Sequence, residues 1–513
     1  MLLINPREYQ TAIFETAKKY NALVVLPTGL GKTLIALMLS IETLKKHPLS
    51  KILFLAPTKP LIEQHFNYFK KNLSELFADL QFFTGSVQAE KRKKIWQTAE
   101  IIFSTPQCIA NDLENFLYDL KEVSLLIIDE AHRCLKNYDY TKVVEKYKHQ
   151  AVNEKILGLT ASPGSDPEIV KQICKNLNIQ KIELRTRDSP DVKPYLQELE
   201  FQKIEIPFPQ EFIELRVLFK RIFDNATNKL RERNYLQGPA NKITLLNLQT
   251  RLAMQVSQRN FAAMYGMTLT AQAIKISHAL ELLETQTLSG LNEYLKSLQK
   301  QAIDKKSRAV QSLVKSPEFN AAMISIQHLL SKKFEHPKIE KLSILIENEF
   351  KENKDAKIII FTQFRETASL IYHHLSQITG IKPSVFVGQA KKATKHGNTG
   401  LSQKEQKQII EKFKEGEINI LVCTSIGEEG LDIPEVSAVI FYEPVPSAIR
   451  KIQRTGRTAR LSPGKLIILI TKDTKDEIHH YASSARERKM HKTIHIIKEE
   501  LKNKEKATSL DKF

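Results

Sequence analysis

ALVVLPTGLGKTLIALMLSIETL, residues 22–44, reads as a buried strand, a glycine-containing turn and a helix in direct succession. The first five residues are all apolar, which is typical of a strand that is buried on both faces of a parallel sheet. Gly29 and Gly31 let backbone N–H groups close around phosphate oxygens, and the helix turns its positive N-terminal end toward the same place. This order is the context that a phosphate-binding P-loop requires, so the stretch predicts a nucleoside-triphosphate site in an α/β domain.

Two side chains at the end of this turn have the chemistry of a P-loop. Lys32 can reach the β and γ phosphates, and Thr33 can hold Mg²⁺ through its hydroxyl. Leu26 stands where the usual pattern begins with glycine, so the prediction depends on the order of strand, turn and helix more than on the letters alone. The expected cofactors are ATP and Mg²⁺.

Short apolar runs separated by helix-length segments occur in two blocks of the chain. The first block contains ALVVL (22–26), ILFLA (52–56), EIIFS (100–104), LLIID (125–129) and ILGLT (156–160), and the second contains KIIIF (357–361), SVFV (384–387), INILVC (418–423), AVIFY (438–442) and LIILI (466–470). Buried strands that alternate with helices form parallel sheets. We therefore expect an α/β fold with two such sheets.

The region between the two blocks has a different character. Residues 211–336 show apolar residues at helical spacing and no convincing strand, and a structureless connection of this length would be improbable. We expect an all-helical insert. It carries 18 Lys and Arg against 10 Asp and Glu, which fits either a nucleic-acid surface or ordinary solvated helix faces.

The charge and the cysteine content limit the classes to which the protein can belong. Lys and Arg outnumber Asp and Glu by 77 to 58, and a net charge of +19 points to a polyanionic partner, most often nucleic acid. The four cysteines form no C-x-x-C pair, which argues against a disulfide framework and for a reducing compartment. With no signal peptide and no membrane-length apolar run, we expect a cytoplasmic protein associated with the nucleoid and no membrane partner.

LLIIDEAH, residues 125–132, supplies acidic groups beside the expected phosphates. Two adjacent carboxylates at the end of a buried strand are costly unless they meet a cation or a proton. Asp129 suits coordination of Mg²⁺, Glu130 suits polarisation of the attacking water, and His132 can link the site to a neighbouring segment. Each alone could be an ordinary strand-end residue, but with the P-loop they predict a nucleoside-triphosphatase site.

QRTGRTAR, residues 453–460, places three arginines in the second block, far along the chain from the P-loop. An arginine supplied from another element can stabilise the charge that spreads over the γ-phosphate during transfer. If the two sheets face each other, Arg457 and Arg460 can close on the triphosphate. The alternative is an internal salt-bridge cluster, for which the nearby segment offers few carboxylates.

These motifs, in this order, resemble those of the superfamily 2 helicases. The resemblance covers about residues 1–495 and includes REYQ (7–10) as the Q motif, LPTGLGKT (26–33), APTKPLIEQH (56–65), STPQ (104–107), DEAH (129–132), TAS (160–162), IIIFTQFRET (358–367), CTSIGEEGLDIP (423–434) and QRTGRTAR. It implies two RecA-like motor domains that hydrolyse ATP at their interface and move along a nucleic acid.

The resemblance also implies roles for individual residues beside the catalytic Lys32, Asp129, Glu130, Arg457 and Arg460. ATP would be bound by Arg7, Gln10, Thr28, Gly29, Gly31, Lys32, Thr33, Gly430 and Asp432. The ATP and nucleic-acid sides would be coupled by His132, Thr160, Ser162 and Gln453. The nucleic-acid backbone would be contacted by Thr58, Lys59, Thr105, Arg365 and Thr424.

A narrower resemblance is to the archaeal Hef proteins and their relatives, the Fanconi anaemia M-type translocases. It is carried by SPDVKPY (189–195), FVGQA (386–390), LSQKEQ (401–406), SIGEEGLDIP (425–434) and YEPVPSAIRKIQRTGRTAR (442–460). That family has a helical insert between its motor domains, acts on forked or branched DNA, moves 3′ to 5′ and serves fork repair and restart. Two alternatives stay open: a duplex-RNA-directed ATPase, and a branched-DNA-binding scaffold that recruits a separate structure-specific nuclease.

The expected domains are residues 1–200 for the first RecA-like domain, 201–336 for the insert, 337–495 for the second RecA-like domain and 496–513 for a charged, flexible tail. ERK at 487–489 resembles part of a nuclease signature, but Thr493 stands where that signature needs Asp, so we expect no nuclease activity. The tail ATSLDKF (507–513) resembles a sliding-clamp-binding peptide that lacks its usual Gln and one aromatic, which makes the clamp a candidate partner.

Overall fold

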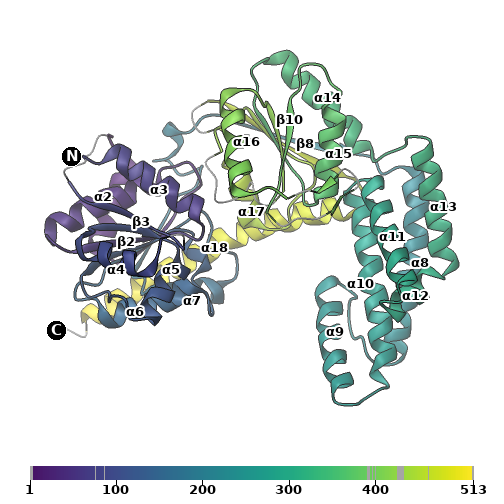
Figure 1. Ribbon diagram of the computed structural model, residues 1–513, viewed down its shortest axis with the longest axis horizontal. Helices are drawn as coiled ribbons and strands as arrows, with labels where there is room; N and C mark the ends of the chain where they lie inside the picture. The colour runs from purple at the N-terminus through teal and green to yellow at the C-terminus, as the bar shows by residue number, and fades with distance from the viewer. Residues whose placement is uncertain are drawn as a thin grey trace.

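The computed structural model describes residues 4–74, 77–85, 87–389, 393–394, 397–398, 400–424, 433–459 and 462–510. Figure 1 shows three bodies: an α/β domain at the left (domain 1), a second α/β domain at the top (domain 2) and a helical body at the right (the insert). The predicted fold class is confirmed.

Domain 1 is built on a seven-stranded sheet in the order β3-β4-β2-β5-β6-β1-β7, with every pairing parallel. Its strands are β1 (Ala22–Val25), β2 (Lys51–Leu55), β3 (Leu80–Phe83), β4 (Ile101–Ser104), β5 (Val123–Ile128), β6 (Ile156–Thr160) and β7 (Lys181–Leu184). Its helices are α1 (Glu8–Lys19), α2 (Lys32–Lys46), α3 (Lys59–Asn72), α4 (Ala89–Thr98), α5 (Pro106–Glu114), α6 (Asp139–Gln150) and α7 (Pro167–Asn176). The strands predicted from the sequence are buried along their whole length, because helices cover both faces of the sheet.

Domain 2 is built on a six-stranded parallel sheet in the order β10-β13-β9-β14-β15-β8. Its strands are β8 (Leu199–Ile206), β9 (Ile358–Phe361), β10 (Pro383–Phe386), β13 (Ile420–Cys423), β14 (Ala438–Phe441) and β15 (Gly464–Thr471), and a two-stranded ladder joins β11 (Ala393–Thr394) to β12 (Gly397–Asn398). The helices are α14 (Pro337–Glu352), α15 (Arg365–Leu375), α16 (Gln403–Glu415) and α17 (Ala448–Thr455).

Strand β8 differs from the domain boundary that we expected at residue 200. It pairs with β15 along its full length, from Leu199 opposite Gly464 to Ile206 opposite Thr471. The chain therefore enters the sheet of domain 2 before it enters the insert. The physical reason is that β15 offers a long row of backbone groups at the edge of the sheet, and β8 satisfies them.

The insert consists of six helices among the described residues: α8 (Gln210–Glu232), α9 (Lys242–Ser257), α10 (Ala263–Thr285), α11 (Leu288–Ile303), α12 (Arg308–Val314) and α13 (Pro317–Ser331). One apolar core joins α8, α10, α11, α12 and α13 near domain 2. A second, smaller core joins the far halves of α8 and α10 to α9. Figure 1 shows this second part as an arm that extends away from both α/β domains.

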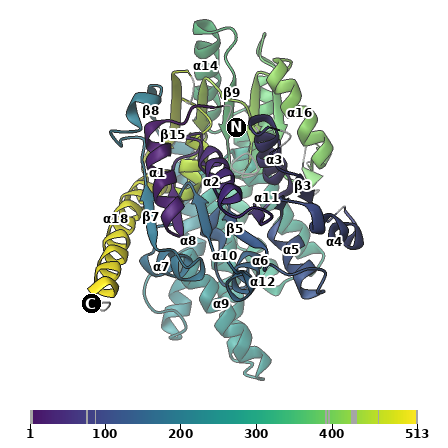
Figure 2. The ribbon, with the colours of Figure 1, turned by 90° about the vertical axis from the view of Figure 1, so that its left-hand side faces the viewer.

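The last helix, α18 (Lys475–Leu510), links the two α/β domains. It begins beside domain 2 and the insert, and Figure 2 shows it continuing along the side of domain 1 to the C-terminus. Met490, Ile494 and Ile497 are buried in the core of domain 1. The segment that we expected to be a flexible tail from residue 496 is helical as far as Leu510, and Ile497 and Leu501 near its start pack on domain 1. Phe513 lies outside the described residues, so the clamp-binding prediction stays a prediction.

Among the helices that the structure describes, none combines the length and the apolar character that a membrane span needs.

Candidate nucleotide site and nucleic-acid surface

The P-loop adopts the backbone that its glycines were predicted to allow. Gly29 and Gly31 have φ values of 86° and 80°, in the left-handed region that favours glycine, and α2 begins at Lys32. The Lys32 ammonium donates a hydrogen bond to the carbonyl of Leu26 (2.9 Å). The turn therefore places backbone N–H groups, a lysine and a helix N-terminus around one point at the end of β1.

The predicted Q motif packs directly on this turn. The amide of Gln10 donates to the Leu30 carbonyl at 3.1 Å, and the hydroxyl of Tyr9 donates to the same carbonyl at 2.8 Å. Tyr9 is fully buried, and Arg7 lies 5.1 Å from the centre of the Tyr195 ring. The Tyr9 contact was not predicted, although its aromatic ring within REYQ is a sign of packing.

The two predicted magnesium ligands lie on either side of one histidine. Nε2 of His65 lies 2.8 Å from Oδ2 of Asp129, and its Nδ1 lies 3.2 Å from the hydroxyl of Thr33. Burial alone would raise the pKa of Asp129, but His65 and Lys32 outweigh it, so the pKa is lowered. An ionised carboxylate beside a hydroxyl fits a hard cation such as Mg²⁺. His65 ends the predicted motif APTKPLIEQH, but its role was not predicted.

Glu130 sits on a strained backbone, with φ 50° and ψ 48°, directly after Asp129. Its carboxylate Oε2 lies 3.2 Å from Nδ1 of His132, and the same nitrogen lies 3.1 Å from the hydroxyl of Thr160. The Thr160 hydroxyl in turn accepts from the backbone N–H of Ser162 (3.1 Å). Three of the predicted coupling residues therefore form one chain of polar contacts that starts at Glu130.

This chain of contacts extends to α18. The hydroxyl of Ser162 donates to the sulfur of Met490 at 2.8 Å, and the hydroxyl of Thr493 donates to the carbonyl of Ser165 at 3.5 Å. Glu487, the first residue of the ERK stretch, pairs with Lys451 on α17 at 2.9 Å. Glu487 and Thr493 thus make contacts between helices and loops, while the absence of nuclease activity remains a prediction.

Of the arginines of QRTGRTAR, the structure describes Arg454 and Arg457, and only the first of these two lies on α17. Helix α17 ends at Thr455 and includes Arg454, whose guanidinium lies 4.8 Å from the ring centre of Phe361 inside domain 2. Arg457 follows the helix and is largely buried, as is Gln453. The predicted residues Arg460, Gly430 and Asp432 lie outside the described residues.

The two domains meet where Gly456 faces the P-loop. A Cβ added at Gly456 would lie 2.6 Å from the Cβ of Thr28, which is closer than side chains can approach. The end of α17 therefore lies directly against the turn that holds Lys32. This is the geometry that the predicted arginine contribution from domain 2 requires.

We expect Gly456→Ala to lower kcat for ATP hydrolysis by about 100-fold, because the added methyl group must push the two domains apart. Steady-state hydrolysis measured beside Gly85→Ala is the check, since a Cβ at Gly85 has nothing within 4 Å. Wild-type turnover by Gly456→Ala would mean that this contact is not used during catalysis.

The residues predicted to contact nucleic acid lie where strands end and helices begin. Thr58 and Thr105 are the N-cap residues of α3 and α5, Lys59 opens α3, Arg365 opens α15, and Thr424 follows β13. Helix N-termini bind anions such as phosphate. The arrangement gives each α/β domain its own candidate set of phosphate contacts.

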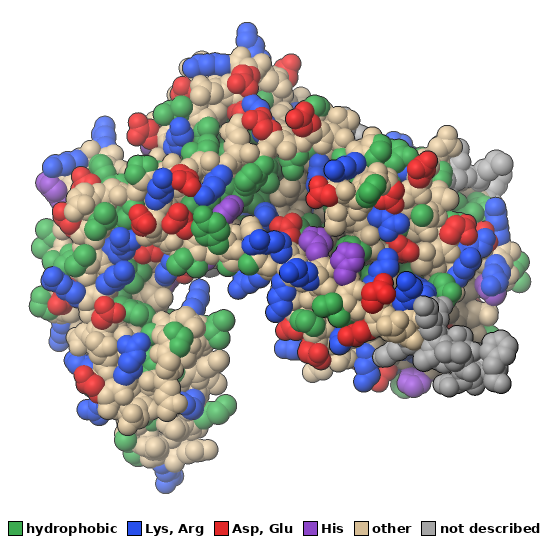
Figure 3. Space-filling model, turned by 180° about the vertical axis from the view of Figure 1, so that it is seen from behind, with side chains coloured by type: hydrophobic (Ala, Val, Ile, Leu, Met, Phe, Trp, Pro, Cys, Tyr) green, Lys and Arg blue, Asp and Glu red, His purple; other side chains and the backbone are tan. Residues whose placement is uncertain are grey.

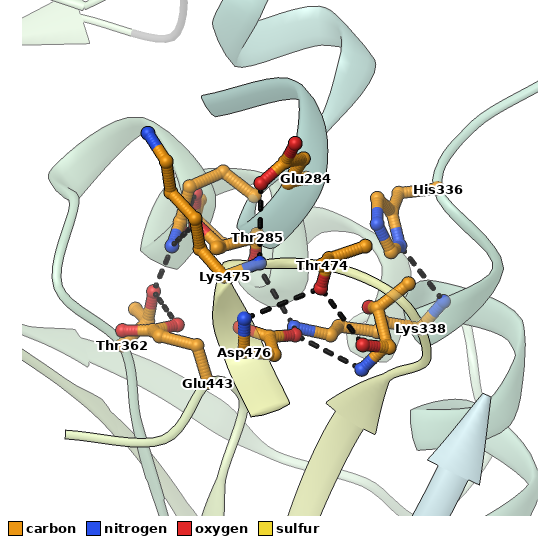
Figure 4. Close-up of polar contacts among 12 residues, drawn as sticks. Glu284, Thr285, His336, Lys338, Thr362, Glu443, Thr474, Lys475 and Asp476 are labelled. Carbon is orange, nitrogen blue, oxygen red and sulfur yellow. Dashed lines mark hydrogen bonds and ion pairs between the residues drawn. The ribbon is translucent and has the colours of Figure 1, made fainter. Parts of the chain in front are cut away.

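A buried polar junction fastens the insert to domain 2 (Figure 4). Lys338 at the start of α14 forms an ion pair with Asp476 at the start of α18, and both side chains are fully buried. The Lys338 ammonium also donates to the carbonyl of Thr285 at the end of α10 (3.1 Å), and Glu284 accepts from the backbone N–H of Lys475 (3.1 Å). The ion pair joins α14 to α18, and the two hydrogen bonds at Thr285 and Glu284 hold the insert to them, so we infer that the insert and domain 2 move as one body.

The same junction reaches the ends of β9 and β14. The hydroxyl of Thr362 lies 3.2 Å from Oε2 of Glu443 and 3.5 Å from Oε1 of Gln286. The same Gln286 oxygen accepts a hydrogen bond from the hydroxyl of Thr367 (2.8 Å). Burial raises the pKa of Glu443 to about 7. The positive charges of Lys338 and Arg454 lower this pKa in part, and the negative charge of Asp476 raises it slightly.

This raised pKa predicts a pH dependence of stability. The folded chain holds the Glu443 proton more tightly than the unfolded chain, so the stabilisation is complete below pH 4.5 and is lost as the pH rises to about 7. Glu443→Gln removes this loss and should gain about 2 kcal/mol relative to wild type between pH 5 and pH 7.5. The check is the unfolding midpoint at both pH values, with the exposed Glu417→Gln as control; equal shifts in wild type and Glu443→Gln would contradict it.

Comparison with known families agrees with this division of the chain. The DEAD/DEAH box helicase family matches residues 7–170, and the helicase conserved C-terminal domain matches residues 337–462. The helical bundle of a putative ATP-dependent RNA helicase matches residues 211–333, which is the insert.

Several characterised or named proteins are similar to the chain over most of its length. A putative ATP-dependent RNA helicase of Methanocaldococcus jannaschii is 38% identical over 96% of this chain, and the ATP-dependent DNA helicase fml1 of Schizosaccharomyces pombe is 33% identical over 92%. A Fanconi anemia group M protein homolog of Mus musculus is 33% identical over 93%. The chain spans 61%, 57% and 25% of the lengths of these three relatives.

A solved structure extends the similarity to the whole fold. The crystal structure of the Pyrococcus furiosus Hef helicase domain is 40% identical and superposes with a TM-score of 0.72, covering 94% of this chain and 100% of that one. This one structure therefore matches both sheets and the insert of the chain, in the same order. The chain belongs to the Hef and Fanconi anaemia M-type helicases of superfamily 2, a family of ATP-hydrolysing enzymes.

Proposed function

We propose that this protein is an ATP-dependent motor that moves 3′ to 5′ on DNA and acts on forked or branched substrates in replication-fork repair and restart. The observation that carries the proposal is the contact between Gly456 of domain 2 and Thr28 of the P-loop. This contact places the triphosphate site at the interface between domain 1 and domain 2, so that hydrolysis and domain movement are linked. Each domain has its own candidate phosphate contacts, which is what a stepping motor needs.

The residues of the site divide the chemistry among them. Lys32 and the P-loop N–H groups hold the β and γ phosphates, and Glu130 orients and polarises the attacking water. Thr33 and Asp129 would hold Mg²⁺, which when bound neutralises charge on the phosphate oxygens. Arg457 and Arg460, supplied by domain 2, stabilise the charge that develops during transfer. Gln10 and Arg7 contact the nucleotide base, and Asp432 and Gly430 complete the site.

Movement follows from alternating grips on the DNA backbone. In domain 1 the grip is formed by Thr58, Lys59 and Thr105, and in domain 2 by Arg365 and Thr424. Closure on ATP shortens the distance between the grips, and opening after hydrolysis releases one before the other. The contacts from Glu130 through His132 and Thr160 to Ser162 transmit the state of the nucleotide toward α18 and the DNA side.

Support for DNA comes from the relatives. The Schizosaccharomyces pombe relative is described as a DNA helicase, whereas the Methanocaldococcus jannaschii relative and the helical-bundle family are described as RNA helicases. Duplex RNA is therefore the second candidate, and it would be read through its shape and its 2′-hydroxyls. We also propose that the protein works with a separate nuclease, binds the sliding clamp through residues 507–513 and is located at the nucleoid.

The polarity is tested with forked DNA that carries a patch of neutral methylphosphonate backbone in one strand only. Phosphate contacts carry the affinity of a tracking motor, so a patch in the tracked strand should stop movement. We expect strand displacement to fail when the patch lies in the strand followed 3′ to 5′ and to continue when it lies in the complement. The opposite pattern would contradict the proposed direction.

A further inference from the structure

A turn that follows β7 holds Arg187 on domain 1. The backbone N–H of Thr186 donates to the hydroxyl of Ser189 at 2.9 Å, which closes the turn around Arg187. Val192, which follows the turn, is fully buried in the core of domain 1. The main chain of Arg187 is therefore fixed to domain 1 on both sides, by β7 before it and by Val192 after it.

The side chain of Arg187 crosses from domain 1 to domain 2. Its Nη2 donates to the carbonyl of Ala459 at 3.2 Å and to the carbonyl of Gln197, shortly before β8, at 3.4 Å. The side chain is partly buried, and it forms no ion pair with any residue that the structure describes. Burial lowers the pKa of Arg187, and the charge of Asp188 opposes this in part. Because burying a cation is costly, the two carbonyls are the contacts that offset the cost.

Ala459, which accepts this hydrogen bond, has a strained backbone. Its φ of 54° lies in the left-handed region, which a residue with a Cβ rarely adopts. Such a conformation persists only where the surrounding contacts impose it. Ala459 stands between Arg457 and Arg460, the two arginines assigned to the triphosphate. Whatever fixes Ala459 therefore also fixes the course of the chain that carries these arginines.

Domain 2 supports the chain around Ala459 from one side. The hydroxyl of Thr458 donates to the carbonyl of Val436 at 2.6 Å. A Cβ added at Gly464 would lie 2.8 Å from the backbone nitrogen of Ala459, so the start of β15 packs closely against it. The carbonyl of Ala459 receives its hydrogen bond from the other domain, through Arg187. The strained residue is thus held between the two α/β domains.

Packing alone does not fix the position of this loop. Figure 3, seen from behind, shows open space between the arm of the insert and domain 1, so the arm does not hold domain 1 in place. A cavity of about 380 Å³ lies between the two α/β domains, lined by Arg187, by Thr28 of the P-loop and by Gly456. Lys407 and Glu63 also form an ion pair across the domains, but both are exposed, and exposed pairs contribute little. The hydrogen bonds of Arg187 therefore restrict a loop that has room to move.

We propose that Arg187 is a positioning residue that places Arg457 at the triphosphate. This rests on the proposed catalytic role of Arg457 and names the contact that couples it to domain closure. When the two domains separate, Arg187 stays with domain 1, its hydrogen bond to Ala459 breaks, and the strained loop relaxes. When the domains close, the bond forms again and Arg457 is placed for phosphoryl transfer. Hydrolysis is thereby confined to the closed arrangement.

The test begins with Arg187→Ala, which should lower kcat for ATP hydrolysis by about 30-fold because a misplaced catalytic group loses most of its effect. The Michaelis constant for ATP should stay within about threefold of wild type, since the P-loop is unchanged. Arg187→Lys keeps a donor and should recover kcat to within about fivefold. Lys193→Ala, which removes an exposed cation from the same connection, should hydrolyse ATP normally. The unfolding temperature of Arg187→Ala should equal that of wild type, which separates positioning from a loss of stability.

The decisive measurement is single-turnover hydrolysis by Arg187→Ala in an Arg457→Ala background. If Arg187 acts through Arg457, its loss should slow this background by less than about threefold, because no Arg457 is left to position. An equal loss in both backgrounds, or a normal kcat of Arg187→Ala alone, would overturn the proposal. Normal hydrolysis by Arg457→Ala itself would instead contradict the proposed role of Arg457, so the two failures are distinguishable.

Discussion

Glu130→Gln should lower kcat for ATP hydrolysis by about a thousandfold while leaving nucleotide binding within about twofold of wild type. The carboxylate follows Asp129 on a strained backbone and lies 3.2 Å from His132, which fixes its direction. Glutamine has the same shape but cannot accept a proton from the attacking water. Steady-state hydrolysis and the binding of a fluorescent ATP analogue measure the two quantities separately.

The matched control is Glu122→Gln, since Glu122 lies just before β5 with its side chain 67% exposed. Its hydrolysis should equal that of wild type. If Glu130→Gln retained more than about a tenth of the wild-type rate, the role of Glu130 as the group that activates water would be wrong.

The second large effect is expected for Arg457→Ala. We expect kcat to fall by about 10³-fold or more, because an arginine supplied in trans stabilises charge that exists only in the transition state. The Michaelis constant for ATP should change far less, since the ground state loses little binding. Single-turnover hydrolysis with saturating ATP is the direct measurement.

Two other arginines of the same segment are the controls. Arg450 is exposed on α17, and Arg450→Ala should hydrolyse ATP normally. Arg454 is 1% exposed and lies against the rings of Phe361 and Phe441, so Arg454→Ala should lower the unfolding temperature. An Arg457→Ala protein with normal kcat would contradict the role given to domain 2 in catalysis.

The buried strands could be predicted from the sequence, whereas most of the edge strands of the two large sheets could not. The exception is β10, which was predicted from SVFV (384–387) although it is only partly buried. Each of the apolar runs that we identified is a strand, because a strand between two helical layers must be apolar on both faces. Strands β3, β7 and β8 lie at sheet edges and are only partly buried, so their residues mix apolar and polar types. The partner of β8 lies more than 250 residues away along the chain, between Gly464 and Thr471, and no local pattern reveals it.

For the candidate site too, local sequence motifs could be predicted, and contacts between segments far apart in the chain could not. The P-loop and the acidic strand end are local motifs, and their chemistry could be read from spacing. The contacts of His65 with Asp129, Ser162 with Met490 and Lys338 with Asp476 join segments far apart in the chain. They depend on packing that the residue pattern does not contain. The Ser162 contact connects the loop after β6 to α18, and the Lys338 pair joins α14 to α18.

The most direct measurement of the central claim is ATP hydrolysis by the wild-type chain with no nucleic acid, single-stranded DNA, forked DNA and duplex RNA, with Glu130→Gln beside it. We predict that forked DNA gives the strongest stimulation and that the variant abolishes it. Stimulation by duplex RNA alone would place the protein with the RNA-directed motors. No stimulation by any nucleic acid would contradict a motor function and favour a DNA-binding scaffold.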